Sequence, residues 1–269
     1  MDDAKRKADA IECEAWRAMY ESAPRPVVEA LGLRVLDVED ATLFLAPRLP
    51  TGQFNRAIGL GNERPPSDAG IDAVVASARE TGASVFFVHA YEGSALGGRL
   101  AARGLPLARR RAWAKMLHDG PLPEVPTSLR IGDVPRTQRT ALARVLAAAH
   151  GMPPPIVPWV EAMIEHPGYR AFGAYDEDAL VAGGLLFLGK EGAWLGLGGT
   201  SPSHRNRGAQ GALMVRRVKE ALEAGTAAIE TETGEPVADE SNPSLANMVR
   251  TGFRKVGSRL NFVAIGRGG

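Results

Sequence analysis

The sequence contains one cysteine, Cys13, in 269 residues. A lone cysteine cannot form an intrachain disulfide, and it excludes a cysteine-rich zinc or iron–sulfur site. The five histidines are scattered along the chain, so each is expected to be a surface residue or a satisfied core residue. We therefore expect no bound metal.

Long apolar runs are also missing. The longest, Val181–Leu188, is far shorter than the ~20 residues that a helix needs to cross a bilayer. Charges are scattered through the N-terminal segment, which lacks the apolar core of a signal peptide. These features predict a cytoplasmic protein with no membrane partner.

Neither sign of charge is in excess. Lys and Arg number 32 and Asp and Glu number 31, which gives a net charge of +1. This balance argues against binding of nucleic acid through bulk charge, so no nucleic-acid partner is expected. The hydrophobic content of 45% is ordinary for a soluble globular protein and excludes wholesale disorder. The length corresponds to two domains or one large one.

The proline-rich segment Gly120–Thr127 is the best candidate for a linker, since its three prolines each disfavour helix in the preceding residue. We place a domain boundary there, which gives residues 1–124 and 125–269. The order strand, helix, glycine, apolar strand, helix, glycine, strand is expected in Phe54–Leu117 and again in Trp194–Ile265. This shared order predicts a duplicated α/β unit.

Periodicity and turn residues predict the individual elements. Helices are expected at residues 1–20, 69–80, 96–103, 135–150, 158–166, 208–224 and 244–251. Strands are expected at residues 31–38, 41–45, 54–60, 84–89, 112–117, 129–131, 169–175, 179–188, 193–200, 227–231 and 260–265.

The segment Leu195–Glu220 carries the strongest functional signal. A strand of small residues is followed by two arginines and two glycines just before an amphipathic helix. A helix N-terminus presents unpaired N–H groups and partial positive charge, glycines allow close approach of an anion, and arginines add charge. The pattern predicts a pyrophosphate-binding loop. The alternative is a basic surface turn in front of an ordinary amphipathic helix.

Residues 205–212, Arg-Asn-Arg-Gly-Ala-Gln-Gly-Ala, resemble the Arg-x-x-Gly-x-Gly/Ala acyl-CoA motif of the GNAT acyltransferase superfamily. Gln210 stands where Gly or Ala is usual. The segments 231–235, 242–247 and 251–253 resemble the later strand, the asparagine-bearing helix and the Gly-Phe turn of that family. The resemblance covers about Leu129 to Ile265. The N-terminal half is similar only in topology and has no Arg-x-x-Gly before its helix.

The resemblance implies an α/β fold of two GNAT-like repeats, each a mixed, mainly antiparallel sheet flanked by helices. The N-terminal repeat would be degenerate and the C-terminal repeat would be the acyltransferase domain. Acyl-CoA, with acetyl-CoA as the expected donor, would lie in a V-shaped gap beside the strand 193–200. The residues implied to bind it are Leu197, Gly198, Gly199, Thr200, Arg205, Arg207, Gly208, Ala209, Gln210, Gly211 and Asn247.

Direct acyl transfer to an amine needs a general base, because an alkylammonium has a pKa of ~10. Glu230 and Glu232 alternate on the strand beside the cofactor, so both carboxylates would face one side. We predict Glu232 as the base, with Glu230 as the second candidate. The alternative is that they line a polar cleft or pair with Arg205 or Arg207. The helix expected at 244–251 lacks the tyrosine that often protonates the leaving thiolate in this family.

The leading interpretation is an N-acyltransferase that acts on a small-molecule or peptide amine, and a homodimer is a further expectation. A second interpretation is a non-catalytic acyl-CoA-binding sensor or interaction protein with the same fold. The missing tyrosine and Gln210 favour this second interpretation. A third is an enzyme of a small-thiol or aminoacyl pathway, because tandem repeats occur in such relatives.

Overall fold

A computed structural model describes residues 2–237 and 240–264. Within these residues the strands form one sheet of eleven strands in the order β1-β2-β3-β4-β11-β5-β10-β9-β8-β7-β6. The strands are β1 (Arg34–Val38), β2 (Ala41–Leu45), β3 (Arg56–Ile58), β4 (Phe86–Tyr91), β5 (Leu107–His118), β6 (Arg130–Asp133), β7 (Tyr169–Asp176), β8 (Ala179–Leu188), β9 (Ala193–Thr200), β10 (Ile229–Gly234) and β11 (Phe253–Ala264).

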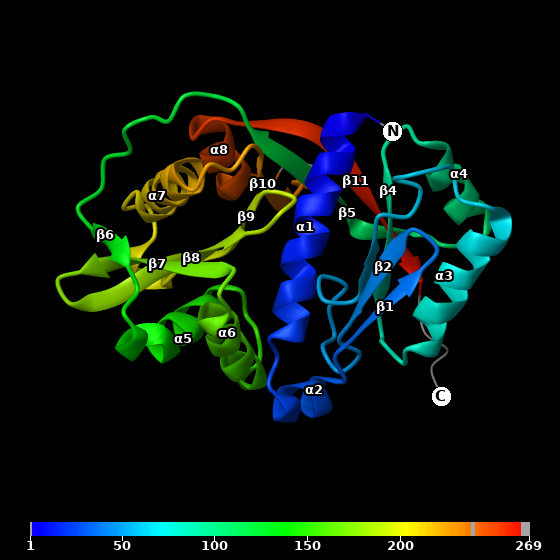
Figure 1. Cartoon of the computed structure of the whole chain (residues 1–269), viewed down its shortest axis with the longest axis horizontal. Helices are drawn as coiled ribbons and strands as arrows, with labels where there is room; N and C mark the ends of the chain where they lie inside the picture. Colours follow the sequence, from blue (N-terminus) through cyan, green and yellow to red (C-terminus); the bar gives the residue numbers. More distant parts are fainter. Residues whose placement is uncertain (1, 238–239, 265–269) are drawn as a thin grey trace.

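Helices cover both faces of this sheet (Figure 1). They are α1 (Asp3–Glu21), α2 (Arg25–Leu31), α3 (Asp68–Glu80), α4 (Ala95–Ala102), α5 (Arg139–Ala149), α6 (Val157–Glu165), α7 (Ala209–Glu223) and α8 (Pro243–Arg250). Helices α1, α5 and α6 share one apolar core on one face of the sheet. On the opposite face there are two separate cores, one with α3 and α4 in the N-terminal half and one with α7 in the C-terminal half. Figure 1 shows α1 running between the two halves of the molecule.

The two halves repeat the same order of elements. β3, α3, β4, α4 and β5 are followed later in the chain by β9, α7, β10, α8 and β11. In each half the strands that flank the first of these helices are parallel, β3 with β4 and β9 with β10, and the other pairings are antiparallel. The order expected from the sequence is therefore present in both halves.

The last strands of the two halves are exchanged. β5 pairs with β10 of the C-terminal half, and β11 pairs with β4 of the N-terminal half. β5 and β11 also pair with each other, so the sheet continues through the centre of the molecule. The division at residues 124 and 125 stays a prediction, and a cut there would separate β5 from its partner β10.

Several predicted boundaries are corrected by the structure. The strand expected at 31–38 begins only at Arg34, because α2 occupies Arg25–Leu31 with a proline in its first turn, a position where proline favours a helix. β5 and β11 both begin earlier than predicted, since their mutual pairing extends from Phe253 opposite His118 to Phe262 opposite Leu107. The predicted end of the last strand, Ile265, lies outside the described residues.

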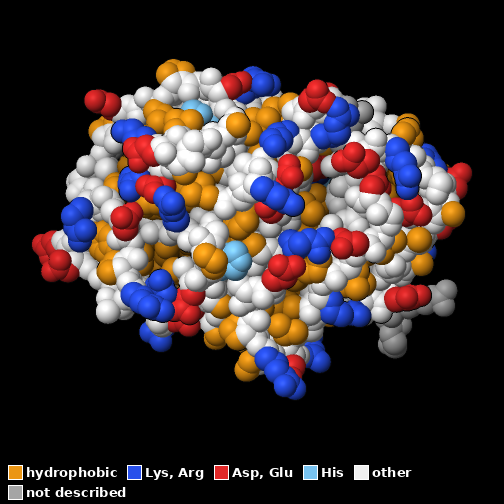
Figure 2. Space-filling view, viewed as in Figure 1, with side chains coloured by type: hydrophobic (Ala, Val, Ile, Leu, Met, Phe, Trp, Pro, Cys, Tyr) orange, Lys and Arg blue, Asp and Glu red, His pale blue; other side chains and the backbone are white. Residues whose placement is uncertain are grey.

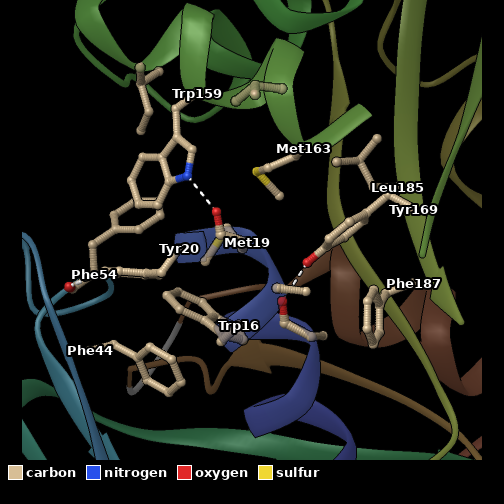
Figure 3. Packing of buried hydrophobic residues seen from close by; sticks show 14 of the residues in the cluster. Trp16, Met19, Tyr20, Phe44, Phe54, Trp159, Met163, Tyr169, Leu185 and Phe187 are labelled. Carbon is tan, nitrogen blue, oxygen red and sulfur yellow. Dashed lines mark hydrogen bonds between the residues drawn. The ribbon is translucent and has the colours of Figure 1, made fainter. Parts of the chain in front are cut away.

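Aromatic packing fixes α1 to the C-terminal half. Trp16 and Tyr20 of α1 pack with Phe44, Phe54 and Trp159 in one buried cluster (Figure 3). The indole Nε1 of Trp159 donates a hydrogen bond to the backbone oxygen of Met19, 2.7 Å away. Because Trp159 belongs to α6, the first helix of the chain closes the apolar face of the second half.

The surface carries interspersed charges. Figure 2 shows Lys and Arg side chains mixed with Asp and Glu over the face in view, with no broad area of one sign. In the described part of the chain, no helix has both the length and the apolar character required to cross a membrane.

Candidate functional site

The strands β9 and β10 part at the position where the sequence predicts the cofactor. They pair only over Ala193–Leu195 and Ile229–Thr231. The hydroxyl of Thr231 donates to the backbone oxygen of Leu195 at 2.8 Å, close to the point of divergence. Beyond this point β9 continues beside β8 and has no further pairing with β10. The two strands therefore part at the position of the gap that the resemblance implies.

A local irregularity turns β9 away from β10. The register against β8 shifts between Gly183 and Leu185, opposite Gly199 and Gly196. In this stretch Leu197 has a φ of 47°, in the left-handed region that few non-glycine residues adopt. Such backbone strain concentrates at functional sites. It marks the start of the segment predicted to pair with pantetheine.

A groove of about 980 Å³ lies beside the end of β9 that has parted from β10. It is bounded by the end of β9, the loop before α7, the N-termini of α7 and α8, and the linker at residues 123–126. Nine of the eleven predicted cofactor-binding residues line it, namely Gly198, Gly199, Thr200, Arg205, Gly208, Ala209, Gln210, Gly211 and Asn247. Leu197 and Arg207 are not among the lining residues.

The N-terminus of α7 has no side-chain cap. Gly208 is the N-cap residue, with a φ of 78°. A Cβ at this position would lie 2.4 Å from the backbone oxygen of Pro126, so only glycine fits without displacing the linker. The N–H groups of the first helical turn are therefore left for an anion, and they face the groove where Gly208–Gly211 lines it.

Gln210 connects the helix to the strand. Its Nε2 donates to the hydroxyl of Thr200 at 2.9 Å. A Cβ on Gly198 would lie 2.7 Å from the Gln210 Oε1 atom, so the glycine leaves room for this side chain. The departure from the usual Gly or Ala therefore adds a bridge between α7 and β9 and keeps the helix start intact.

The two arginines of the motif have different surroundings. Arg205 lines the groove and is exposed. Arg207 instead forms two bonds with the carboxylate of Asp176, at 2.6 and 3.0 Å, and one with Ser128. The hydrogen bond from Arg207 lowers the pKa of Asp176. The role of Arg207 in binding the cofactor stays a prediction, and in this structure its guanidinium is paired with the Asp176 carboxylate.

The N-terminal half has a different helix start at the corresponding place. Ser67 caps α3 by accepting the N–H of Gly70 at 2.9 Å, and Asp68 adds a carboxylate in the first turn. A smaller cavity of about 430 Å³ lies between the end of β4 and the loop after β3. Asp68 is paired with Arg99 and Arg103, at 2.9 and 2.8 Å. The Ser67 cap thus occupies an N–H group of the kind that α7 leaves open.

Glu230 and Glu232 face the same side of β10, as the strand period predicts. The ammonium of Lys115 lies 2.7 Å from Glu230 and 3.1 Å from Glu232. Glu232 also pairs with Arg56 and Arg259, each at 2.9 Å. Their partners are thus not Arg205 or Arg207, which corrects that alternative.

Both carboxylates belong to a buried ion cluster under α1. Its cations are Arg56, Lys115 and Arg259, and its carboxylates are Asp9, Glu12, Glu230 and Glu232. Neither glutamate of β10 lines the groove, and the side chain of Glu232 is 8% exposed. The role of Glu232 as a general base stays a prediction. Its carboxylate forms ion pairs with all three cations of the cluster.

Within the cluster, burial favours the neutral form of Glu230. Burial raises the pKa of Glu230 to about 8, which outweighs the opposing charge of Lys115. For Glu12, burial also disfavours the charged form, but Arg259, Arg56 and Lys115 hold its pKa well below the usual range. With Glu230 neutral, three carboxylates face three cations. The charges then balance within the buried cluster.

This protonation predicts a dependence of stability on pH. The pKa of Glu230 rises from 4.5 to about 8 on folding. Its stabilising contribution is therefore present below 4.5 and is lost as the pH rises through about 8. Glu230→Gln keeps a neutral group at this position, so the variant should lose less stability than the wild type between pH 5 and pH 8, roughly the span of the shift. Denaturant midpoints measured across this range test it, and parallel profiles would contradict it.

His150 is a residue that the sequence reasoning missed as a candidate. It follows Ala149, which lines the groove, and its imidazole bonds to the backbone of Gly198. Burial lowers its pKa, and the bond to Gly198 partly opposes this, so the ring is neutral at pH 7. A scattered histidine carries no signal in the sequence, because its proximity to β9 depends on how α5 packs.

No protein-family model matches the sequence, and a search of curated proteins found no match. Solved structures do match. A GCN5-related N-acetyltransferase from Kribbella flavida is 15% identical, with a TM-score of 0.66 over 100% of this chain and 97% of that one. A GCN5-related N-acetyltransferase from Sphaerobacter thermophilus is 17% identical, with a TM-score of 0.61 over 85% of this chain and 81% of that one.

A third similar structure is a tandem GNAT protein from the clavulanic acid biosynthesis pathway, solved without AcCoA. It is 18% identical, with a TM-score of 0.60 over 83% of this chain and 77% of that one. At these identities the likeness shows the fold. The chain therefore has the α/β fold of the GNAT superfamily, as the motifs of its C-terminal half predict.

Proposed function

We propose that the protein is an acyl-CoA-dependent N-acyltransferase that uses acetyl-CoA, and that the groove between the end of β9 and the N-termini of α7 and α8 holds the acyl donor. One observation carries the proposal: nine predicted residues line a single groove where two parallel strands part in front of an uncapped helix. The α7 N-terminus and Arg205 would bind the pyrophosphate. The backbone of Leu197–Thr200 would pair with the pantetheine arm, and Asn247 would contact the arm from α8.

The acceptor in this proposal is an amine of a small molecule or peptide. Catalysis then requires removal of an amine proton. Glu232 is the predicted base, and His150 is the candidate that the structure adds, since it is a neutral imidazole bonded to β9. Titration calorimetry with acetyl-CoA tests binding, and a thiol-release assay over an amine panel tests transfer.

A non-catalytic acyl-CoA sensor is the second candidate function. The observation that favours it is the pairing of Glu230 and Glu232 inside the ion cluster, away from the groove. A sensor would bind acetyl-CoA and release no thiol with any amine. Thiol release with one amine would exclude it.

The proposed pyrophosphate site at the N-terminus of α7 predicts the effect of Gly208→Val. A side chain there collides with the linker and strains the φ of 78°. Acetyl-CoA affinity should fall at least about tenfold, which equals ~1.4 kcal/mol. The matched control is Gly225→Ala, at the other end of α7, where a Cβ meets no atom within 4 Å and the φ is 77°. Equal affinity of the Gly208→Val protein and the wild type would contradict the proposed site.

The proposal also fixes the stoichiometry. We expect one acetyl-CoA per chain, because α3 is capped by Ser67 and carries Asp68 in its first turn. Calorimetry with the wild type measures the number of sites. Two sites of similar affinity would show that the N-terminal half also binds the cofactor.

A further inference from the structure

Arg217 is a buried cation that is not part of the ion cluster. It lies on α7 under β8 and β9 and is 2% exposed. Its Nη1 donates to the backbone oxygens of Leu185 at 3.0 Å and Gly196 at 3.3 Å, and its Nε donates to Leu213 at 3.2 Å. Among the described residues these carbonyls are its hydrogen-bond partners, and no carboxylate pairs with it. Burial lowers its pKa to about 10, which leaves it charged at neutral pH.

Burial of the Arg217 charge without a counter-ion lowers the stability of the fold. Burying an ion without a counter-ion typically costs several kcal/mol, and an apolar side chain of similar volume would avoid that cost. The neighbouring Arg216 shows the ordinary arrangement, since it is partly exposed and pairs with Glu220. The charge of Arg217 therefore indicates a role that apolar packing would not fill.

The guanidinium lies where β9 changes direction. Gly196, whose oxygen it binds, directly precedes Leu197 with its φ of 47°. A Cβ on Gly184 would lie 2.7 Å from the guanidinium carbon, and a Cβ on Gly198 would lie 3.5 Å from Nη2. The guanidinium thus fills the space beneath the irregular segment, and Gly184 leaves room for it.

We propose that Arg217 is a positioning residue for the thioester end of the acyl donor. This inference rests on the proposed function. By holding the Gly196 oxygen, Arg217 fixes the point at which β9 turns from a paired strand into the edge of the groove. In a trans peptide the C=O and N–H point to opposite sides, so the same contact fixes the direction of the Leu197 N–H. A hydrogen bond from a charged donor also polarises that peptide and strengthens its N–H as a donor.

The effect should be confined to one end of the cofactor. Arg217 lies eight residues after Ala209, the first residue of α7, which is about 12 Å along the helix. The nucleotide end would bind at the helix start, and the thioester would lie near Gly196 and Leu197. A defect at Arg217 should therefore leave nucleotide binding intact.

The experiment compares two probes, acetyl-CoA and 3′-phospho-ADP, which is the nucleotide half of coenzyme A. For Arg217→Met, we expect the Kd of acetyl-CoA to rise at least tenfold and the Kd of 3′-phospho-ADP to change less than twofold. Arg217→Lys should keep part of the acetyl-CoA affinity, because it retains the charge. Arg216→Met is the matched control on the same helix, and it should change neither value more than twofold.

The outcomes separate this inference from the proposed function. If the wild type binds acetyl-CoA and Arg217→Met binds it equally well, the role of Arg217 is wrong and the proposed function stands. An equal loss of both probes would also contradict the role, since it would indicate general damage to the groove. Failure of the wild type to bind acetyl-CoA overturns both. If Arg217→Met does not fold, Gly184→Ala, which displaces the guanidinium from the β8 side, should show the same selective loss.

Discussion

Replacing Lys115 with methionine should lower the free energy of unfolding by about 3–5 kcal/mol, the range for breaking a buried ion pair. The Lys115 ammonium contacts Glu12 at 2.8 Å, Glu230 at 2.7 Å and Glu232 at 3.1 Å, and it is fully buried. Methionine fills a similar volume but removes the charge. The remaining carboxylates would then lie beneath α1 with one cation fewer. Urea unfolding at pH 7 measures the loss.

Lys255→Met is the matched control for this prediction. Lys255 pairs with Glu235 at 2.6 Å, but its side chain is 44% exposed. Exposed pairs contribute between roughly 0 and 1 kcal/mol, so the control should unfold almost as the wild type does. A Lys115→Met protein as stable as this control would show that the cluster does not hold α1 on the sheet.

Glu232→Gln should lower turnover by about 10²–10⁴ at pH 7, which is the usual effect of losing a general base. Acetyl-CoA affinity should stay near that of the wild type, because Glu232 does not line the groove. The loss should shrink as the pH rises, since more of the amine is then already deprotonated. Thiol release, measured from pH 7 upward once an acceptor is found, gives this profile.

Two variants decide between the candidate bases. Glu230→Gln keeps the neutral group that the cluster already holds, so it should turn over much faster than Glu232→Gln. His150→Asn removes the imidazole that bonds to Gly198. Normal turnover of Glu232→Gln together with a large loss in His150→Asn would move the base to His150. Thermal melts of all three variants show whether the fold is retained.

The pyrophosphate-binding loop could be predicted from the sequence because the residues that form it are close together in the chain. A glycine before a helix, arginines beside it and a glycine-rich strand all lie within Leu195–Glu220. The structure places nine of the predicted residues in one groove. Helix starts and strand alternation depend on neighbours in the chain, so local patterns are enough to find them.

The remaining features depend on partners that are distant in the chain. β5 inserts beside β10, and Lys115 meets Glu12 from α1, 103 residues earlier. Arg207 is held by Asp176, the last residue of β7. No local pattern identifies such partners, because a charged residue in a strand is as consistent with an exposed position as with a buried ion pair. The exchange of β5 and β11 has the same cause, since each of them pairs with a strand of the other half.

A crystal structure with acetyl-CoA is the most direct measurement of where the acyl donor binds. We expect its pyrophosphate at the N-terminus of α7, within reach of Arg205, and its pantetheine along Leu197–Thr200. The acyl group should then lie where β9 and β10 part, beside Leu195 and Thr231. Acetyl-CoA bound in the N-terminal cavity beside β4, with the groove at α7 empty, would contradict the proposed site.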